Sequence, residues 1–508
     1  MINRYKLDVY LLGAAVVVVL AGIFTLYTQE YQLAEGSGRW YKQLIFFGLG
    51  LIICLGIRRM NYQVLEAYAV PAYLGSLFLL MLVLVFGATI KGAKSWFRLG
   101  PINVEPSEIA RLATILLLAK YLQLKERDMG KIPTLLIAFG ICLLPMLLIV
   151  VQPAFGDAFA FTPILLSMLF IAGADMYHIG SVVVFFSVAI SVPLYIEYHN
   201  ITLVDPLVGH LSDLGKTDLL PAVRLLKTDI WKFAAKGKIP VGIEGADKDY
   251  LVGLAGNQNL RASLVEAVNS VRSDSGGLLL RLLENDTLLL ALGIFFALSA
   301  LVLLILRLTQ GTSLANLRKL YIPFGVIGMS LLSAVAVHTT FSFKYHQIAR
   351  VTAFINPDRF PRDLAYQTRA SRAAIGSGEL SGRGIFQGDM TTGERPLVPE
   401  AYTDFIFTAW CERTGFLGGT LILLLLLSIP LRGMLVSFES RDRFASLLSA
   451  GISFMFFFHI LMNVGIAVGL LPVTGLPLSF MSYGGSHLIT AMVSLGILLS
   501  VARRRFAN

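Results

Sequence analysis

The sequence is poor in charge and in cysteine. Only 15% of its 508 residues are charged and 56% are hydrophobic, whereas a soluble domain carries about 25% charged residues. Uncharged runs of about 20 residues, the length that crosses a bilayer, recur from end to end. The three cysteines, Cys54, Cys142 and Cys411, lie within or beside apolar segments without a CxxC pattern or a histidine cluster. The sequence therefore suggests an integral membrane protein with neither a disulfide framework nor a zinc site.

The net charge has a topological explanation. It is +10, from 42 Lys and Arg against 32 Asp and Glu. In a soluble chain this excess would suggest a nucleic-acid partner, but many of these basic residues lie between the apolar runs, where they orient a membrane protein. We expect no nucleic-acid partner.

The hydropathy pattern predicts an all-α polytopic membrane protein with about twelve transmembrane helices. The predicted spans are 9–28, 43–57, 69–88, 107–122, 132–151, 157–173, 178–196, 287–306, 321–340, 414–430, 444–464 and 487–502. Basic residues at 58–62, 120–131, 307–319, 431–443 and the C-terminus fall on one side with the N-terminus, which the positive-inside rule places in the cytoplasm. Both termini are then cytoplasmic.

This topology also predicts the parts of the chain. They are an N-terminal transmembrane bundle (1–196), a small extracytoplasmic insert (197–286), two additional spans (287–340), a large extracytoplasmic loop (341–413) and the C-terminal spans (414–508). Amphipathic runs in the insert predict helices. The insert lacks cysteine, so burial alone, or packing on a neighbour, must hold it together.

The loop 341–413 is rich in basic residues and glycine. Its basic residues include Arg350, Arg369 and Arg372, and its glycines include those at 376, 378, 382, 384 and 388. Arginine grips phosphate bidentately, and glycine lets backbone N–H groups approach an anion. The loop suits a lipid-linked pyrophosphate. A solvated loop, or contact with anionic lipid headgroups, is the alternative.

Two carboxylates stand at the mouth of an apolar helix within the segment 398–407. They are Glu400 and Asp404, with Thr403 between them. Ionisable residues entering a membrane bundle are functional candidates. The alternative is that Thr403 or Asp404 caps the helix N-terminus.

Two further segments carry unusual patterns. The run 92–100 contains Lys94 and Trp96, and it precedes Glu108 and Arg111 in the first turns of a span, where both are expected to face the bundle interior. The alternative for Trp96 is that it belongs only to the belt of aromatic residues at the membrane–water interface. The stretch 463–486 is dense in Gly and Pro, which indicates irregular backbone that lines a cavity or is buried in protein.

Taken in order, these pieces resemble the SEDS family of peptidoglycan glycosyltransferases, the bacterial elongation and division proteins RodA and FtsW. The resemblance rests on short motifs and covers most of the chain apart from 197–320. The motifs are Gly92-Ala93-Lys94-Ser95-Trp96, Pro106-Ser107-Glu108, Gln152-Pro153, Asn356-Pro357, Ile375-Gly376-Ser377-Gly378, Pro399-Glu400 with Thr403-Asp404-Phe405-Ile406-Phe407, Pro472-Val473-Thr474-Gly475 and Ser482-Tyr483-Gly484-Gly485-Ser486. The region 354–357 and the segment 384–388 favour the RodA side.

The resemblance implies a polymerase in the bacterial cytoplasmic (inner) membrane. Its substrate would be lipid II, the undecaprenyl-pyrophosphate-linked disaccharide pentapeptide, and its partner a single-span class B penicillin-binding protein that crosslinks the strands. Asp404 would be the catalytic aspartate, acting as a general base on a sugar hydroxyl. Arginines or a divalent cation, Mg or Mn, would stabilise the pyrophosphate leaving group. The candidate substrate-binding residues are Lys94, Trp96, Glu108, Arg350, Arg369, Arg372, Ser377, Glu400 and Thr403.

The chain departs from the family pattern in several places. Gln152-Pro153-Ala154-Phe155-Gly156-Asp157 stands where the family usually has Gln-Pro-Asp-Leu-Gly-Thr, so the acid has moved by almost one helical turn and Asp157 is its candidate substitute. Tyr402 replaces a usual His, Arg413 a Glu, Glu379 a Gly and Ser479 a Pro. The family usually has about ten spans, so two extra ones are expected here.

Two other functions fit the same features. A transporter that flips lipid II or another lipid-linked anion would also need a basic outer loop, intramembrane charges and broken helices. Its site should be reached from both faces, whereas the charged motifs here gather at the outer mouth. A noncatalytic scaffold that recruits a transpeptidase would keep the fold and make Asp404 dispensable.

Overall fold

The structure is a computed structural model of the whole chain. It describes residues 8–31, 38–90, 93–100, 102–152, 154–226, 230, 233–234, 239, 245–275, 280, 282–283, 285–309, 320–340, 348, 352–355, 364–392 and 396–504. The chain forms two compact units. Unit 1 comprises Met1–Ile179 and Phe360–Asn508, and unit 2 comprises Gly180–Arg359.

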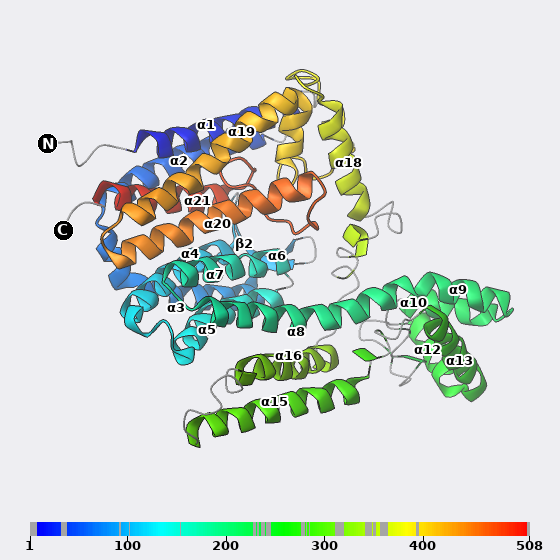
Figure 1. Ribbon diagram of the computed structural model, residues 1–508. Helices are drawn as coiled ribbons and strands as arrows, with labels where there is room; N and C mark the ends of the chain where they lie inside the picture. The colour runs from blue at the N-terminus through cyan, green and yellow to red at the C-terminus, as the bar shows by residue number, and fades with distance from the viewer. Residues whose placement is uncertain are drawn as a thin grey trace. The chain divides into compact units, whose positions relative to one another are not determined.

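Unit 1 is a bundle of helices. They are α1 (Val9–Tyr31), α2 (Arg39–Arg59), α3 (Tyr62–Phe86), α4 (Pro106–Leu124), α5 (Ile132–Val151), α6 (Phe155–Phe159), α7 (Phe161–Ile171), α18 (Leu364–Ser377), α19 (Ile406–Glu439), α20 (Arg443–Ala467) and α21 (Gly485–Arg504). Helix α2 packs on α21, α3 on α4, and α19 on both α1 and α20 (Figure 1).

Helix α20 is the centre of unit 1. It packs against α4, α7, α19 and α21 (Figure 1), and Leu447, Leu448 and Ile452 lie in the main hydrophobic core. Small residues allow this close packing. A Cβ added at Gly451 would lie 2.7 Å from atoms of Ile115 and Met168, so a larger residue would push α4 and α7 away.

Unit 2 contains the remaining helices. They are the last part of α8 (Met176–Thr202), then α9 (Val204–Asp213), α10 (Leu220–Leu226), α12 (Ala246–Gly256), α13 (Gln258–Ser275), α15 (Asp286–Thr309) and α16 (Tyr321–Thr340). The insert has a hydrophobic core of its own, which includes Leu207, Leu211, Val223, Leu254 and Leu264. All three cysteines of the chain are free and buried.

Each of the twelve predicted spans is helical, but fewer meet the criteria for crossing a membrane. Within the described residues, ten helices are long and apolar enough. The two that do not qualify are α4, which carries Glu108, Arg111 and Lys120, and α7, which has 11 residues. The span predicted over 178–196 is part of a continuous helical segment, Met176–Asp213, of 38 residues. That helix therefore runs on into the residues expected to form the insert.

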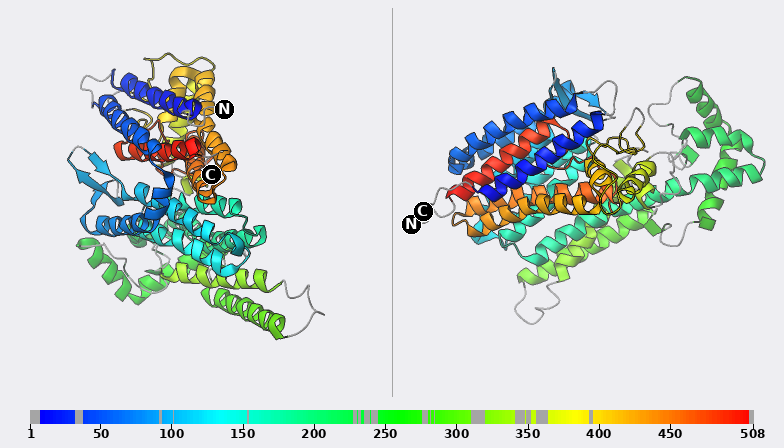
Figure 2. Two further views of the ribbon diagram at one scale, coloured as in Figure 1. Left: turned by 90° about the vertical axis from the view of Figure 1, so that its left-hand side faces the viewer. Right: turned by 90° about the horizontal axis from the view of Figure 1, so that it is seen from above.

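The loop that contains Lys94 and Trp96 forms a small antiparallel sheet, which the all-α prediction did not include. Its strands are β1 (Ala88–Ile90), β2 (Ala93–Leu99) and β3 (Ile102–Val104), in the order β1-β2-β3 (Figure 2). The sheet links the end of α3 to the start of α4. It thereby fixes where the first turn of α4, with Glu108, begins.

Candidate active site

The segment that leads into α19 is a series of tight turns around Glu400. The carbonyl of Glu400 accepts hydrogen bonds from the backbone N–H groups of Thr403 (3.1 Å) and Phe405 (3.3 Å), and its Oε2 accepts one from the Thr403 hydroxyl at 3.2 Å. Helix α19 starts at Ile406, with Phe405 at the N-cap and no side-chain capping bond. The N-cap position of α19 is thus occupied by Phe405, and not by Thr403 or Asp404.

The connection between α20 and α21 holds Thr403 and Asp404 by their backbone. The Asn463 side-chain amide donates to the Asp404 carbonyl at 2.9 Å and to the Leu476 carbonyl at 3.1 Å. The Ser482 hydroxyl donates to the Thr403 carbonyl at 2.7 Å. The later part of the connection, Leu476 and Leu478–Ser482, is buried, as expected for irregular backbone within a membrane protein. The Asp404 carboxylate oxygen Oδ2 lies 3.8 Å from the position that a Cβ would take at Gly475, so the carboxylate lies beside this segment.

The ends of α1 and α2 support the same segment from another side. Gln29 donates to the Ala401 carbonyl at 3.2 Å, and Gln43 donates to the Ser482 carbonyl at 2.9 Å. The Arg39 guanidinium carbon lies 4.0 Å from the centroid of the Tyr402 ring, which is cation–π distance. Burial and the neighbouring Glu400 raise the pKa of Tyr402 to about 12, so its phenol stays protonated at neutral pH. The tyrosine that replaces the family's usual histidine therefore provides an aromatic face for an arginine.

A buried acid and a buried arginine, Glu412 and Arg413, support the segment from the start of α19. The carboxylate of Glu412 accepts hydrogen bonds from the N–H of Met390 (2.8 Å) and from the N–H and hydroxyl of Thr391 (3.2 and 2.6 Å). The Arg413 guanidinium donates to the same hydroxyl at 2.9 Å. Met390 in turn accepts a bond from the N–H of Val398 at 2.9 Å. The arginine that stands where the family usually has a second Glu thus balances the charge of Glu412.

Glu108 is buried among partners from α21. Its two carboxylate oxygens contact the Ser486 hydroxyl at 2.7 Å and Nδ1 of His487 at 2.9 Å. The predicted orientation toward the bundle interior is confirmed for Glu108 and for Arg111, which are 4% and 2% exposed.

Arg111 lies at the centre of a second set of contacts. One guanidinium nitrogen, Nη2, forms an ion pair with Asp157 at 2.8 Å, and the other, Nη1, contacts Nε2 of His459 at 2.8 Å. The His459 and His487 rings stack with 5.4 Å between their centroids. Burial, and the charges of Asp157 and Glu108, raise the pKa of Glu105 well above its ordinary range. Asp157, displaced by almost one turn from the usual position of the acid, still finds a basic partner.

The other predicted site residues lie elsewhere in unit 1 or outside the described residues. The Lys94 ammonium donates to the Val85 carbonyl at 2.8 Å, and half-buried Trp96 pairs with Ala88 in the sheet. Arg369 and Arg372 are exposed on α18, a helix that packs on α19 and α20. Ser377 ends α18 and donates to the Ala374 carbonyl at 2.8 Å. Arg350 lies outside the described residues, as do Asn356 and Pro357.

Several residues at this site were not predicted. Arg39, Gln43, Glu412, His459 and His487 all contact the segments described above. The available signal was a polar side chain within or at the end of an apolar run, which is costly unless it has partners. Glu379 illustrates a different signal. It has φ of 45°, a left-handed conformation that glycine adopts without strain, which explains why glycine is usual there.

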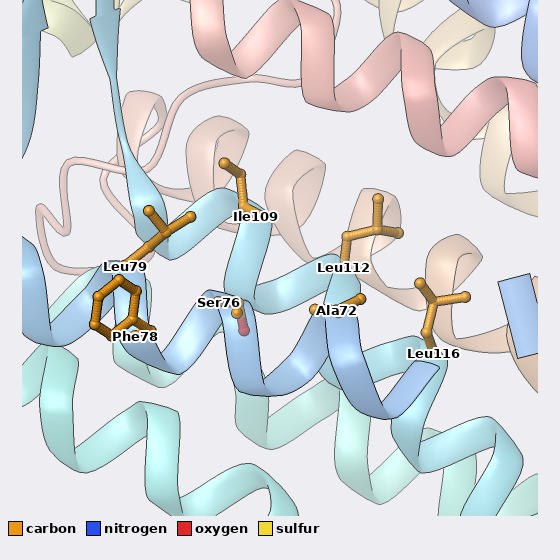
Figure 3. A pocket seen from close by; sticks show the side chains of 9 residues that line it. Ala72, Ser76, Phe78, Leu79, Ile109, Leu112 and Leu116 are labelled. Carbon is orange, nitrogen blue, oxygen red and sulfur yellow. The ribbon is translucent and has the colours of Figure 1, made fainter. Parts of the chain in front are cut away.

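A groove between α3 and α4 has no polar chemistry to offer. Its volume is about 470 Å³ (Figure 3), and its walls are Ala72, Gly75, Ser76, Phe78, Leu79, Ile109, Leu112, Ala113 and Leu116. None of these side chains titrates, and the Ser76 hydroxyl is bonded to the Tyr73 carbonyl. The groove therefore offers no side chain that could act as an acid or a base.

The chain is similar to known proteins along nearly its whole length. The sequence profile of a family described as cell cycle protein, FtsW/RodA/SpoVE, matches residues 5–214 and 282–506. The profile leaves residues 215–281 unmatched, a shorter segment than the 197–320 that we expected to lie outside the resemblance. The peptidoglycan glycosyltransferase RodA of Treponema pallidum is 28% identical over 98% of both chains. A probable peptidoglycan glycosyltransferase FtsW of Trichlorobacter lovleyi is 23% identical over 97% of this chain and 93% of its own.

A solved structure shows the same fold. It comes from a study of the structural coordination of polymerization and crosslinking by a peptidoglycan synthase complex. The match covers 99% of each chain, with a TM-score of 0.59 and 22% sequence identity. Together with the ten apolar helices, these findings identify a multi-pass membrane protein. The chain belongs to the FtsW/RodA/SpoVE family of cell cycle proteins.

Proposed function

We propose that this protein is a peptidoglycan glycosyltransferase that polymerises lipid II at the outer face of the bacterial cytoplasmic membrane, with Asp404 as its general base. The observation that carries the proposal is the support of the Asp404 segment. Asn463 and Ser482 bind the carbonyls of Asp404 and Thr403, and α19 begins two residues after Asp404, at Ile406. A carboxylate on a segment fixed by its backbone is suited to act on a reacting group.

The proposed reaction needs a base and a way to stabilise the leaving group. A sugar hydroxyl is a poor nucleophile at neutral pH, so Asp404 would accept its proton as the oxygen attacks the anomeric carbon of the second sugar. The C–O bond to the pyrophosphate then breaks, and the anomeric centre inverts. Cations near the site would stabilise the charge on the departing pyrophosphate. Arg369 and Arg372, exposed on α18, are our candidates.

A divalent cation is compatible with the site under one condition. Among the described residues, no group of three or more His, Cys, Asp or Glu could hold a metal ion. Mg²⁺ is commonly bound by one or two carboxylates together with substrate phosphates. Mg or Mn would therefore be held by Asp404 or Glu400 together with the substrate's pyrophosphate, and when bound it would neutralise charge on the leaving group.

The partner and the orientation belong to the same proposal. A synthase complex that coordinates polymerization and crosslinking has the same fold, which supports a single-span class B penicillin-binding protein as the partner. Basic residues on the loops beside the N-terminus support cytoplasmic termini. Within the family we favour the RodA-like role in elongation over the role in division, because the RodA relative is 28% identical and the FtsW relative 23% identical over similar lengths.

The test is polymerisation of labelled lipid II by purified protein with a divalent cation present. Asp404→Asn keeps the size and polarity of the side chain, and we expect it to lower the rate by about 10²–10⁴-fold with unchanged yield and thermal unfolding. Asp389→Asn is the matched control, because this aspartate lies in the same outer loop and its side chain is 74% exposed. Wild-type rates in Asp404→Asn would contradict the base role.

The same preparation separates the alternatives. A transporter would move labelled lipid II across a vesicle membrane without making polymer. A scaffold would bind the transpeptidase, and neither the wild type nor Asp404→Asn would make polymer.

A further inference from the structure

We infer that His459 is a positioning residue of the proposed transferase site, which couples the buried Arg111–Asp157 ion pair to the segment that carries Asp404. The inference rests on the proposed function, because it assigns His459 a role in placing Asp404. The His459 side chain has one partner on each side of its ring. Nε2 lies 2.8 Å from Nη1 of Arg111, and Nδ1 lies 3.1 Å from the Ser479 hydroxyl.

The chemistry of these partners fixes the state of the ring. A guanidinium only donates hydrogen bonds, so Nε2 of His459 must carry its lone pair and accept from Arg111. The imidazole is then neutral with its proton on Nδ1, and it donates to the oxygen of Ser479. His459 is 1% exposed and Ser479 is 2% exposed, so both contacts are shielded from solvent.

The contact with Ser479 reaches the Asp404 segment in two short steps. Ser479 lies between Leu476 and Ser482. The Leu476 carbonyl shares the amide of Asn463 with the Asp404 carbonyl. Ser482 accepts from the N–H of Leu478 at 2.8 Å and donates to the Thr403 carbonyl. A shift of the connection at Ser479 would therefore be transmitted to Thr403 and Asp404 through hydrogen bonds on both sides.

The contact with Arg111 ties this connection to α4 and α6. Arg111 lies on α4, and its partner Asp157 lies on α6. Gly156, which precedes Asp157, packs so tightly on the Thr474 carbonyl that a Cβ there would overlap it. The elements that carry the ion pair therefore contact the connection at two places. One is the close packing of Gly156 on Thr474, and the other is the polar contact through His459 to Ser479.

Two departures from the family pattern meet at this residue. The acid of the Gln-Pro-Asp motif has moved to Asp157, and Ser479 replaces a proline. Proline has no side-chain group that could accept from Nδ1 of His459, whereas serine does. Asp157 and Ser479 are therefore the two outer members of one row of contacts, Asp157–Arg111–His459–Ser479, which accounts for both departures together.

The test compares kcat and KM for lipid II in four single variants and one double variant of the full-length protein. His459→Phe removes both polar contacts at similar ring volume, and we expect kcat to fall about ten- to hundredfold, as a small misplacement of a reacting group does. KM should stay unchanged, since the cations proposed to bind pyrophosphate lie on α18. His459→Gln can accept from Arg111 and donate to Ser479, so it should restore most of the lost rate.

Ser479→Ala isolates the contact on the connection side, and Ser449→Ala is its matched control. Ser449 is a buried serine of the same helix as His459, and its hydroxyl has no hydrogen-bond partner. We expect Ser479→Ala to lower kcat while Ser449→Ala leaves it unchanged. The double variant His459→Phe/Ser479→Ala should be no slower than His459→Phe alone, because both changes break one interaction. Faster amide exchange over 476–482 in His459→Phe, reversed in His459→Gln, is the readout independent of activity.

The outcomes separate this inference from the proposed function. No polymer from the wild type, or full activity in Asp404→Asn, would refute the proposed function. Wild-type kcat in Ser479→Ala, or additive losses in the double variant, would refute the role of His459 while leaving the transferase intact. If His459→Phe fails to fold, Ser479→Ala still decides the question.

Discussion

Replacing Asp157 with alanine should destabilise unit 1 substantially. The Arg111 side chain is 3% exposed and that of Asp157 is 19% exposed, with 2.8 Å between Nη2 and Oδ1. Removing the acid leaves a buried positive charge whose other partner, His459, is neutral. Breaking a buried ion pair in this way costs about 3–5 kcal/mol, which is about two to four powers of ten in the folding equilibrium.

Two further variants distinguish a lost charge from a lost contact. Asp157→Asn keeps an oxygen that Arg111 can bond, so its cost should be smaller than that of Asp157→Ala. Arg111→Met/Asp157→Ala removes both charges and should recover part of the loss, although Nε2 of His459 then loses its donor. The order of stability we expect is wild type, Asp157→Asn, the double variant, and finally Asp157→Ala.

The assay is thermal unfolding of purified protein in detergent, with lipid II polymerisation measured on the same samples. Glu126→Ala is a suitable control, since this acid also pairs with an arginine, Arg443, but its side chain is 55% exposed. Such pairs contribute about 0–1 kcal/mol. An Asp157→Ala protein that unfolds with the wild-type midpoint would show that the displaced acid does not neutralise Arg111, and the reasoning would fail.

Three other changes test separate parts of the molecule. Burial and the charges of Asp157 and Glu108 raise the pKa of Glu105, so the stabilising protonated form is lost as the pH rises through that raised pKa. Glu105→Gln should therefore reduce the loss of stability with rising pH when thermal unfolding is measured against pH. An unchanged profile would contradict this expectation. Arg369→Ala and Arg372→Ala should raise KM for lipid II and change the free energy of unfolding by no more than about 0.5 kcal/mol. Lys131→Ala is the control and should leave KM unchanged, because this exposed lysine lies on a loop predicted to be cytoplasmic. Normal kinetics in both arginine variants would favour contact with lipid headgroups. Deleting 200–284 removes the insert's own hydrophobic core and should weaken co-purification with the transpeptidase while polymerisation persists; undiminished yield would make the insert a spacer.

The helices could be predicted from sequence because apolar length is a local property. Every predicted span is helical, and the irregular backbone of 468–484 follows from its Gly and Pro content. The predicted number of spans exceeded the ten that qualify for a simple reason. Helix α4 carries three charged residues, of which Glu108 and Arg111 are buried inside unit 1, and α7 has only 11 residues, so apolar length alone could not classify them.

The site was only partly predictable because its contacts join distant residues. Arg111 and His459 are 348 positions apart, and Glu108 and His487 are 379 apart. No spacing rule brings such pairs together, so the histidines had no signal beyond their polarity within apolar runs. Asp404, Glu400 and Glu108 could be named because they belong to contiguous motifs. The partners that hold them come from α2, α20 and α21.

Backbone strain gives an independent reason to place the working part of the molecule here. Among the described residues, three other than glycine have positive φ, namely Glu379 at 45°, Glu400 at 57° and Phe480 at 70°. Each costs about 1–3 kcal/mol and persists only where its surroundings fix it. Glu400 lies between the turn held by Glu412 and the carbonyls held by Asn463 and Ser482. Phe480 follows Ser479 directly and is fully buried in the core.

Two of the three strained residues, Glu400 and Phe480, therefore lie in or beside the hydrogen-bonded segments that support Asp404. Glu379 lies against the kink of α19, where its carbonyl accepts the N–H of Phe416 at 2.8 Å. Strain of this kind would be lost in evolution or relaxed in the fold unless the exact backbone path had a use. A general base gains most from such a path, since a displacement of about 1 Å can cost about a hundredfold in rate. In the proposed mechanism, the buried Arg111–Asp157 pair and the strained turns would serve the same requirement, which is to hold the backbone of Asp404 in one position.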